Sequence, residues 1–450
     1  MMGHRQVEQA ALFYEFSLER HVPSDHLLRS IDRFVDLEQI RQDLAPFYSA
    51  IGRPSIDPEL MIRMLLIGYC FGIRSERRLC DEVHLNLAYR WFCRLGLDGA
   101  VPDHSTFSKN RHGRFRESDL FRRVFESVLH RCIEERLVGG EGFAVDASLI
   151  KADANRQKGI EGDKGLPAEA AGRAINEYLA VLDDAAFGAA TEVTPKFVSP
   201  ADPAARWTGA HGGQAFFAYS TNYLVDVENA IIVDVEATTA IRQAEVLAAK
   251  RMIERSLERF DLYPSRLLGD SGYGSAEMLA WLVYEHGIEP HVTVFDKSAR
   301  TDGTFSREDF TYDHTSDVYT CPDGKMLTTT GTLVNDGATM LYRASKHDCT
   351  DCALKARCCP KDLVRKVSRS IYEGARDMAR QIARSWEGRT SRRLRKKIEM
   401  LFAHLKRILK LDRLRLRGPN GARDEFTLAA TAQNLRKMAK LIAMPAARPG

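Results

Sequence analysis

Two short apolar segments of the chain each lead into an aspartate. The first, GFAVDASLI, begins at Gly142 and reaches Asp146, and the second, RLLGDSGYG, reaches Asp270, which is 124 positions later (270 minus 146). A carboxylate on a buried strand is costly unless it is paired or bound to a metal. Ligand sites in open α/β sheets gather at the carboxyl ends of strands. We therefore predict a strand in each segment, with its aspartate at or just before the strand's end.

The pattern of apolar residues changes near Gly139. Up to about residue 137, apolar side chains recur at three- and four-residue spacing, as in DPELMIRMLLIGYCFGI, which is typical of helices. After Gly139, short runs of Val, Ile, Phe and Tyr bounded by Gly and Asn indicate strands, including a hairpin that turns at Glu228-Asn229. Helical segments between and after these strands predict a mixed α/β sheet flanked by helices.

These changes divide the chain into regions. We predict an all-α N-terminal domain for DNA binding or dimerisation at residues 1–137. The first part of an α/β core follows at 138–299, with an insertion at about 155–213, and then a Cys-rich insertion at 300–362. The C-terminal helices of the core are expected at 363–442 and a tail at 443–450. No segment reaches the roughly 18 to 20 apolar residues of a membrane span. The start lacks the zones of a secretion signal. We expect a cytoplasmic protein.

The net charge of +4 is unevenly distributed. From Arg389 to Arg417, twelve Lys or Arg are accompanied only by Glu399 and Asp412, a local balance of +10 that leaves about −6 for the remainder. Such a concentration favours a polyanionic partner, and nucleic acid above all. The alternative explanation is a solvated helix face.

Paired carboxylates become favourable beside hard divalent cations such as Mg²⁺, which prefer oxygen ligands. Two ions about 3.5 to 4 Å apart, bridged by a shared aspartate, stabilise the attacking and leaving oxygens of a phosphodiester displacement. A third acid is normally needed, and we choose Glu399. A helical wheel puts it with Arg395 and Lys406 on the flank of an apolar face. That face is formed by Leu394, Ile398, Leu401, Leu405 and Leu409.

Each acid also has a plainer explanation. Asp146 and Asp270 could be turn or cap residues, and Glu399 could form a helix salt bridge with Arg395. Three acids in the preceding helical stretch compete for the third position but are better explained as ordinary surface residues: Glu373, Asp377 and Glu387.

Taken together, these motifs make most of the chain resemble the DDE transposases of bacterial insertion sequences. The family's first catalytic Asp matches Asp146 in AVDASLIKADAN, and the second matches Asp270 in LLGDSGYGS. Its C-terminal signature, an Arg four residues before the catalytic Glu and a Lys seven after it, fits Arg395, Glu399 and Lys406. The segments GRPSIDPELMIRMLLIGYCFGIRSERRLCDEV and VPDHSTFSKNR are typical of the amino-terminal region in this group.

The resemblance implies a ribonuclease-H-like catalytic domain that cleaves DNA at terminal inverted repeats and joins the freed 3′-hydroxyl to target DNA. It implies two Mg²⁺ or Mn²⁺ ions held by Asp146, Asp270 and Glu399, and a homodimer or higher oligomer on double-stranded DNA near the bacterial nucleoid. The signature's Tyr falls on Arg392 here. We expect DNA contacts from Arg392, Arg395, Lys406, Arg407 and Arg413. The alternatives are a nuclease of the same fold that does not join strands, and an inactive, domesticated DNA-binding protein.

Five of the nine cysteines lie between positions 321 and 359. Tetrahedral zinc needs four thiolate or imidazole ligands, and Cys321, Cys349, Cys352 and Cys358 could supply them across a β-ribbon. Some relatives carry a similar cluster. Reduced structural cysteines are the other explanation.

Overall fold

The computed structural model describes residues 16–49, 51, 55–167, 171–209, 213–295 and 300–443. The chain forms two compact units. Unit 1 comprises Met1–Gly139, Ala147–Leu262 and Ile398–Gly450, and unit 2 comprises Gly140–Asp146 and Tyr263–Lys397. The boundaries of the units differ from those of the predicted domains, because one strand and one helix each contribute residues to both units.

The N-terminal part of unit 1 is helical, as predicted. Its helices are α1 Leu18–His21, α2 Leu27–Asp32, α3 Glu38–Leu44, α4 Pro58–Cys70, α5 Glu76–Leu85, α6 Leu87–Phe92, α7 His104–His112, α8 Arg114–Glu117 and α9 Leu120–Glu134. Side chains cap them as the sequence suggests: Asp57 accepts from the Glu59 amide at the start of α4, and Asp103 accepts from the Ser105 amide at the start of α7. Helix α4 is buried along nearly its whole length, so it forms the core of this region.

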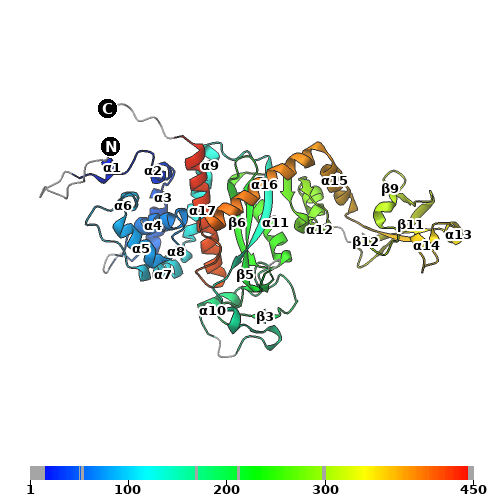
Figure 1. Cartoon of the computed structure of the whole chain (residues 1–450), viewed down its shortest axis with the longest axis horizontal. Coiled ribbons are helices and arrows are strands. Elements are labelled where there is room, and N and C mark those ends of the chain that lie inside the picture. The colour runs from blue at the N-terminus through cyan, green and yellow to red at the C-terminus, as the bar shows by residue number, and fades with distance from the viewer. Residues whose placement is uncertain are drawn as a thin grey trace, which may run out of the picture. The chain divides into compact units, whose positions relative to one another are not determined.

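The main sheet is mixed (Figure 1). Its strands are β1 Gly142–Lys151, β4 Arg206–Thr208, β5 Phe216–Asp226, β6 Ile232–Thr239, β7 Arg266–Gly269 and β8 Glu289–Val292. The order is β4-β5-β1-β7-β8, with β6 also paired to β5. Strands β5 and β6 are antiparallel, whereas β7 runs parallel to both β1 and β8. The predicted hairpin is present, and the Asp226 carboxylate accepts from the amides of Glu228 and Asn229 in its turn.

Helices cover the part of the sheet that belongs to unit 1. Helix α11, Arg242–Phe260, contacts β5 and β6, and helix α17, Gly418–Leu441, contacts β6, α4 and α9. Strands β5 and β6 are buried almost throughout, which requires cover on both faces. The buried side chain of Asn434 in α17 accepts from the Ile232 amide at 2.9 Å and donates to the Ile232 carbonyl at 2.8 Å. These bonds fasten α17 to β6.

The described part of residues 155–213, interpreted above as an insertion, contains short elements: the 3-10 turns η2 Arg156–Lys158 and η3 Gly162–Lys164, β2 Ile160–Glu161, α10 Arg173–Leu179, β3 Phe197–Val198 and β4. In the segment RAINEYLAVLDDAAF, the helix α10 ends at Leu179. Strand β4 pairs with β5, so this segment extends the main sheet.

Unit 2 combines β7 and β8 with helices and a second sheet. Helix α12, Ala276–Ala280, continues as a π-helical turn, Trp281–Glu285, and contacts α15, Glu373–Arg384, which packs on β8. The Cys-rich region forms an antiparallel sheet in the order β13-β12-β11-β10-β9. Its elements are β9 Thr311–Asp313, β10 Val318–Thr320, β11 Met326–Val334, β12 Thr339–Ala344, α13 Lys346–Thr350, α14 Lys355–Cys358 and β13 Lys366–Ser370, preceded by the 3-10 turn η6 Arg307–Asp309.

The long helix α16, Trp386–Arg407, contributes residues to both units. No helix in the described part of the chain is both long and apolar enough to cross a membrane.

Candidate active site

Asp146 and Asp270 lie on neighbouring parallel strands of unit 2. Strands β1 and β7 pair through three consecutive residues, ending with Ala144 opposite Leu268, at a constant offset of 124. Asp270 directly follows β7 and keeps an extended backbone, with φ −83° and ψ −179°. Continued for two residues beyond Ala144 and Leu268, the same offset would place Asp146 opposite Asp270. Neighbouring strands are about 4.8 Å apart, and residues in register point to the same face. The two carboxylates thus share one face of the sheet.

The expectation of an aspartate at the end of each strand is right for Asp270 and wrong for Asp146. Strand β1 continues to Lys151, so Asp146 lies in its middle. The physical reason is that β1 is longer than its neighbour: β7 stops at Gly269, and the remainder of β1 belongs to unit 1 beside β5. The paired acids lie where the short strand ends.

The loop after Asp270 is held by backbone contacts. The Asp270 carboxylate accepts from the Gly272 amide at 2.7 Å, so the cap explanation considered for this residue is realised. A carboxylate has acceptor sites on both oxygens, and a cap bond is compatible with a cation at the same group. Gly274 is required by close approach, because a Cβ there would lie 2.0 Å from the Thr293 carbonyl oxygen. The Phe295 amide also donates to the Gly274 carbonyl at 2.9 Å.

Glu399 lies in the part of α16 that belongs to unit 1. Its neighbours Ile398, Leu401 and Leu405 are buried, as the helical wheel predicts, and Glu399 itself is exposed. Within the described residues, its side chain takes part in no hydrogen bond or ion pair, so the alternative salt bridge with Arg395 is not formed.

The description of Glu373 as an ordinary surface acid is wrong. It is 1% exposed and pairs with Arg307 at 2.9 Å, Arg376 at 2.9 Å and Arg380 at 2.8 Å. Asp377 is likewise engaged, by Arg369 at 2.9 Å. The reason is tertiary: Arg307 and Arg369 lie in or next to the Cys-rich region and pack against α15. Both carboxylates serve to attach that region. Glu387 is exposed.

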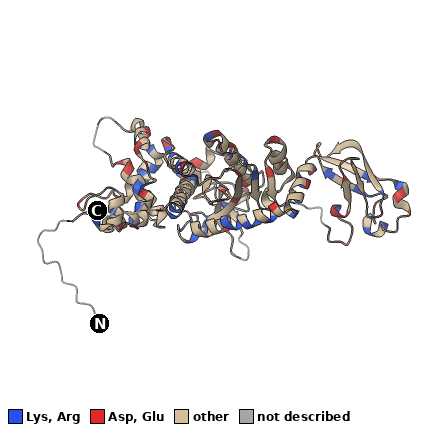
Figure 2. Cartoon of the chain, turned by 90° about the horizontal axis from the view of Figure 1, so that it is seen from above, with Lys and Arg blue, Asp and Glu red and all other residues tan. Residues whose placement is uncertain are grey.

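The basic residues expected to contact DNA differ in their exposure and in the hydrogen bonds and ion pairs that they form. Figure 2 shows Lys and Arg recurring along α16. Arg392 and Arg407 are exposed, and Arg392 donates to the Ala383 carbonyl at 2.8 Å. Lys406 is half-buried, and this burial lowers its pKa. Arg413 pairs with Asp153 at 2.9 Å. Their contacts with DNA stay predictions.

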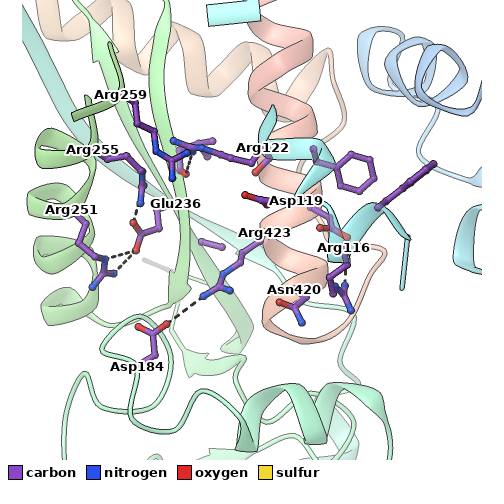
Figure 3. Close-up of a pocket in the computed structure, with 16 residues that line it drawn as sticks. Arg116, Asp119, Arg122, Asp184, Glu236, Arg251, Arg255, Arg259, Asn420 and Arg423 are labelled. Atoms are coloured by element: carbon purple, nitrogen blue, oxygen red, sulfur yellow. Dashed lines mark hydrogen bonds and ion pairs between the residues drawn. The ribbon is translucent and has the colours of Figure 1, made fainter. Parts of the chain in front are cut away.

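A pocket of about 480 Å³ in unit 1 is lined by six arginines (Figure 3). We call it the arginine pocket. Every one of these arginines has a carboxylate partner: Arg116 with Glu177, Arg122 with Asp234 and Glu126, Arg251 with Glu236, Arg255 with Asp234, Arg259 with Glu126, and Arg423 with Asp184. They come from α8, α9, α11 and α17. The pocket is an ion-pair network that joins these helices.

The cysteines of unit 2 gather around an aromatic core. Cys349, Cys358 and Cys359 are buried in a cluster with Tyr319 and Tyr342, and Cys321 packs against it. Cys352, a predicted zinc ligand, is not among the residues of this cluster. Burial raises the pKa of Cys358 to about 11, which favours the thiol form. None of the nine cysteines, all of which lie in described segments, forms a disulfide.

The described residues contain no group of three or more His, Cys, Asp or Glu side chains that could hold a metal ion. The zinc set therefore stays a prediction. The β1–β7 register would put the carboxylates of Asp146 and Asp270 on one face, a donor type that suits a hard divalent cation. The third predicted acid, Glu399, belongs to the other unit.

Two comparisons with protein families bear on this arrangement. Residues 16–113 match a family model described as "Transposase domain (DUF772)", and residues 320–439 match one described as "Transposase DDE domain". The first covers α1 to α7, and the second includes Glu399, while Asp146 and Asp270 lie between the two matched segments. Each matched segment is thus similar to a transposase domain. More particularly, the matches support a DDE transposase of an insertion sequence, a class of metal-dependent enzymes that cut DNA.

Proposed function

We propose that this transposase binds the terminal inverted repeats of its element, cleaves the element's ends and joins them to target DNA, using Asp146, Asp270 and Glu399 as its catalytic acids. The observation that carries the proposal is the β1–β7 register, which pairs Ala144 with Leu268 and would, continued by two residues, set Asp146 opposite Asp270. Two adjacent carboxylates repel each other, and a divalent cation offsets that repulsion.

The strand order supports a ribonuclease-H-like core. The antiparallel pair β5 and β6 lies on one side of β1, and the parallel strands β7 and β8 lie on the other. The two aspartates therefore come from adjacent strands near the middle of a mixed sheet, where open α/β sheets place their ligand sites.

Each acid has a role that its surroundings permit. Asp146 and Asp270 would hold Mg²⁺ from the sheet, and Glu399, exposed on α16, would complete the set. Bound divalent cations supply charge stabilisation for the attacking and leaving oxygens of a phosphodiester. The Gly272 amide orients the Asp270 carboxylate, and the close packing of Gly274 fixes the loop behind it.

Two displacements at phosphorus follow from this assignment. In the first, a water oxygen bonds to phosphorus at the element's end, the bond from phosphorus to the 3′ oxygen breaks, and the released oxygen takes a proton. In the second, that 3′-hydroxyl attacks a phosphodiester of the target and releases a target 3′-hydroxyl. Exposed arginines of α16, such as Arg392 and Arg407, would hold the phosphates.

The test is to replace each acid by alanine (Asp146→Ala, Asp270→Ala, Glu399→Ala) and to measure both binding to terminal-repeat DNA and cleavage. We expect cleavage to fall at least about 1,000-fold, roughly 4 kcal/mol of barrier, with binding retained. Glu387→Ala removes an exposed acid from the same helix and is the matched control. Retained cleavage in any one variant would remove that residue from the set.

A labelled element end distinguishes transposition from the rival functions. A joined product with target DNA is expected for a transposase. Cutting without joining would indicate a nuclease, and binding alone would indicate an inactive DNA-binding protein.

A further inference from the structure

Unit 2 contains a groove of about 700 Å³ between the start of α12, the strand β13 and the turn η6. We call it the α12–β13 groove. Its charged lining consists of five bases and one acid: Arg300, Arg307, Arg365, Lys366, Arg376 and Glu277. These described lining residues have a charge balance of +4. A groove of this size exceeds the space that one phosphate ion needs and is comparable with pockets for much larger ligands.

Arg365 is a buried cation without a carboxylate partner in the described part of the chain. It is 6% exposed and donates only to backbone carbonyls, of Cys358 at 2.9 Å and of Phe305 at 2.9 Å. Its Nε is buried and has no hydrogen-bond partner. The nearby Asp309 is already engaged by the Ser306 amide at 2.6 Å. A buried charge left without a counter-charge is costly, so this position favours an anion from outside the protein.

Two exposed bases in the groove likewise lack a carboxylate partner among the described residues. Arg300 donates to the Thr304 hydroxyl at 3.0 Å, and neither Arg300 nor Lys366 forms an ion pair with a described carboxylate. By contrast, Arg307 and Arg376 share Glu373. Three of the five bases thus have no acid within ion-pair distance among the residues that the structure describes.

We propose that the α12–β13 groove binds the sugar–phosphate backbone of DNA next to Asp270. The proposal rests on the proposed function, because that is where DNA as substrate comes from. The groove begins at Ser275, five residues after Asp270, and an extended chain spans at most about 3.6 Å per residue. The two positions are therefore at most about 18 Å apart. One DNA strand rises about 3.4 Å per nucleotide, so a backbone that reaches both would span about five nucleotides.

The test is DNA binding by the double variant Arg300→Gln/Lys366→Gln as a function of KCl concentration. The probe is a blunt duplex of arbitrary sequence, in the presence of a chelator, so that no cleavage occurs. Each lost phosphate contact reduces the slope of log K against log salt by about 0.9, and we expect a reduction of about 1.8. The matched control is Lys346→Gln/Lys361→Gln, which removes two exposed lysines elsewhere in the Cys-rich region and should leave the slope unchanged.

A variant of opposite sign completes the design. Glu277→Gln removes the one acid among the described residues of the groove lining and should tighten binding to the same duplex. Equal slopes for the groove and control doubles would overturn the proposal. So would the finding that inorganic phosphate stabilises the wild-type chain but not the groove double, with the DNA slope unchanged, since this would define a small-anion site. Because cleavage is not measured, failure here and failure of the catalytic assignment remain distinguishable.

Discussion

The arginine pocket of unit 1 and the α12–β13 groove of unit 2 are both rich in arginine, yet their charges are balanced differently. In the arginine pocket every guanidinium has a carboxylate partner, and Asp234 serves both Arg122 and Arg255. In the groove, Arg365, Arg300 and Lys366 lack such partners within the described residues. Matched charges hold helices together, whereas unmatched charges are available to a polyanion. A count of arginines alone would not separate the two.

The largest difference should appear when one acid of the arginine pocket is removed. Asp234 is 1% exposed, and Asp234→Asn leaves Arg122 and Arg255 without their shared partner. Breaking a buried pair costs about 3–5 kcal/mol. We expect hydrogen exchange in β6 and α11 to accelerate accordingly, while β7 and β8 stay protected.

Arg300→Gln is the matched change in the groove. This exposed side chain has no acid partner in the described segments. We therefore expect the free energy of unfolding of the variant to differ from that of the wild type by less than about 0.5 kcal/mol. An equal destabilisation by both variants would erase the distinction between framework and ligand-binding charges.

A smaller effect should appear as a pH dependence of the stability of unit 1. Burial raises the pKa of Asp424, at the edge of the arginine pocket, to about 7, although Arg111 and Arg116 act in the opposite direction. An unfolded aspartate titrates near 3.9. Between about pH 4 and pH 7 the folded state therefore holds a proton that the unfolded state has lost, and this residue makes stability fall as pH rises. Above about pH 7 its contribution is constant.

Asp424→Asn removes that dependence. Urea unfolding midpoints should be measured at pH 5 and pH 7.5. The stability of the variant relative to the wild type should be greater at pH 7.5 than at pH 5. Parallel pH profiles for the two proteins would show that Asp424 is ionised in the folded state.

The sequence was sufficient to predict those features that depend on local pattern. The apolar runs before Asp146 and Asp270 indicated strands, and periodicity of 3.6 residues placed Ile398, Leu401 and Leu405 on the buried face beside Glu399. Helix capping by Asp57 and Asp103 also follows from local rules.

Features that depend on which distant segments meet could not be predicted. The interval of 124 between the aspartates equals the β1–β7 offset, but nothing local shows which strands pair or in which register. Glu373 was misjudged because its partner Arg307 is 66 positions away (373 minus 307) and meets it only in the folded unit. Likewise, the spacing of cysteines did not reveal that Cys359, rather than Cys352, joins the buried cluster.

The central claim is that Asp146 and Asp270 share one divalent cation of the proposed pair. Calorimetric titration of Mn²⁺ into the wild type, Asp146→Asn, Asp270→Asn and the double variant tests it directly. We expect each single change to weaken Mn²⁺ binding at least about tenfold, with little further loss in the double variant, because residues that act on one ion are not additive. Unchanged affinity in either single variant, or losses that simply add, would contradict a shared ion.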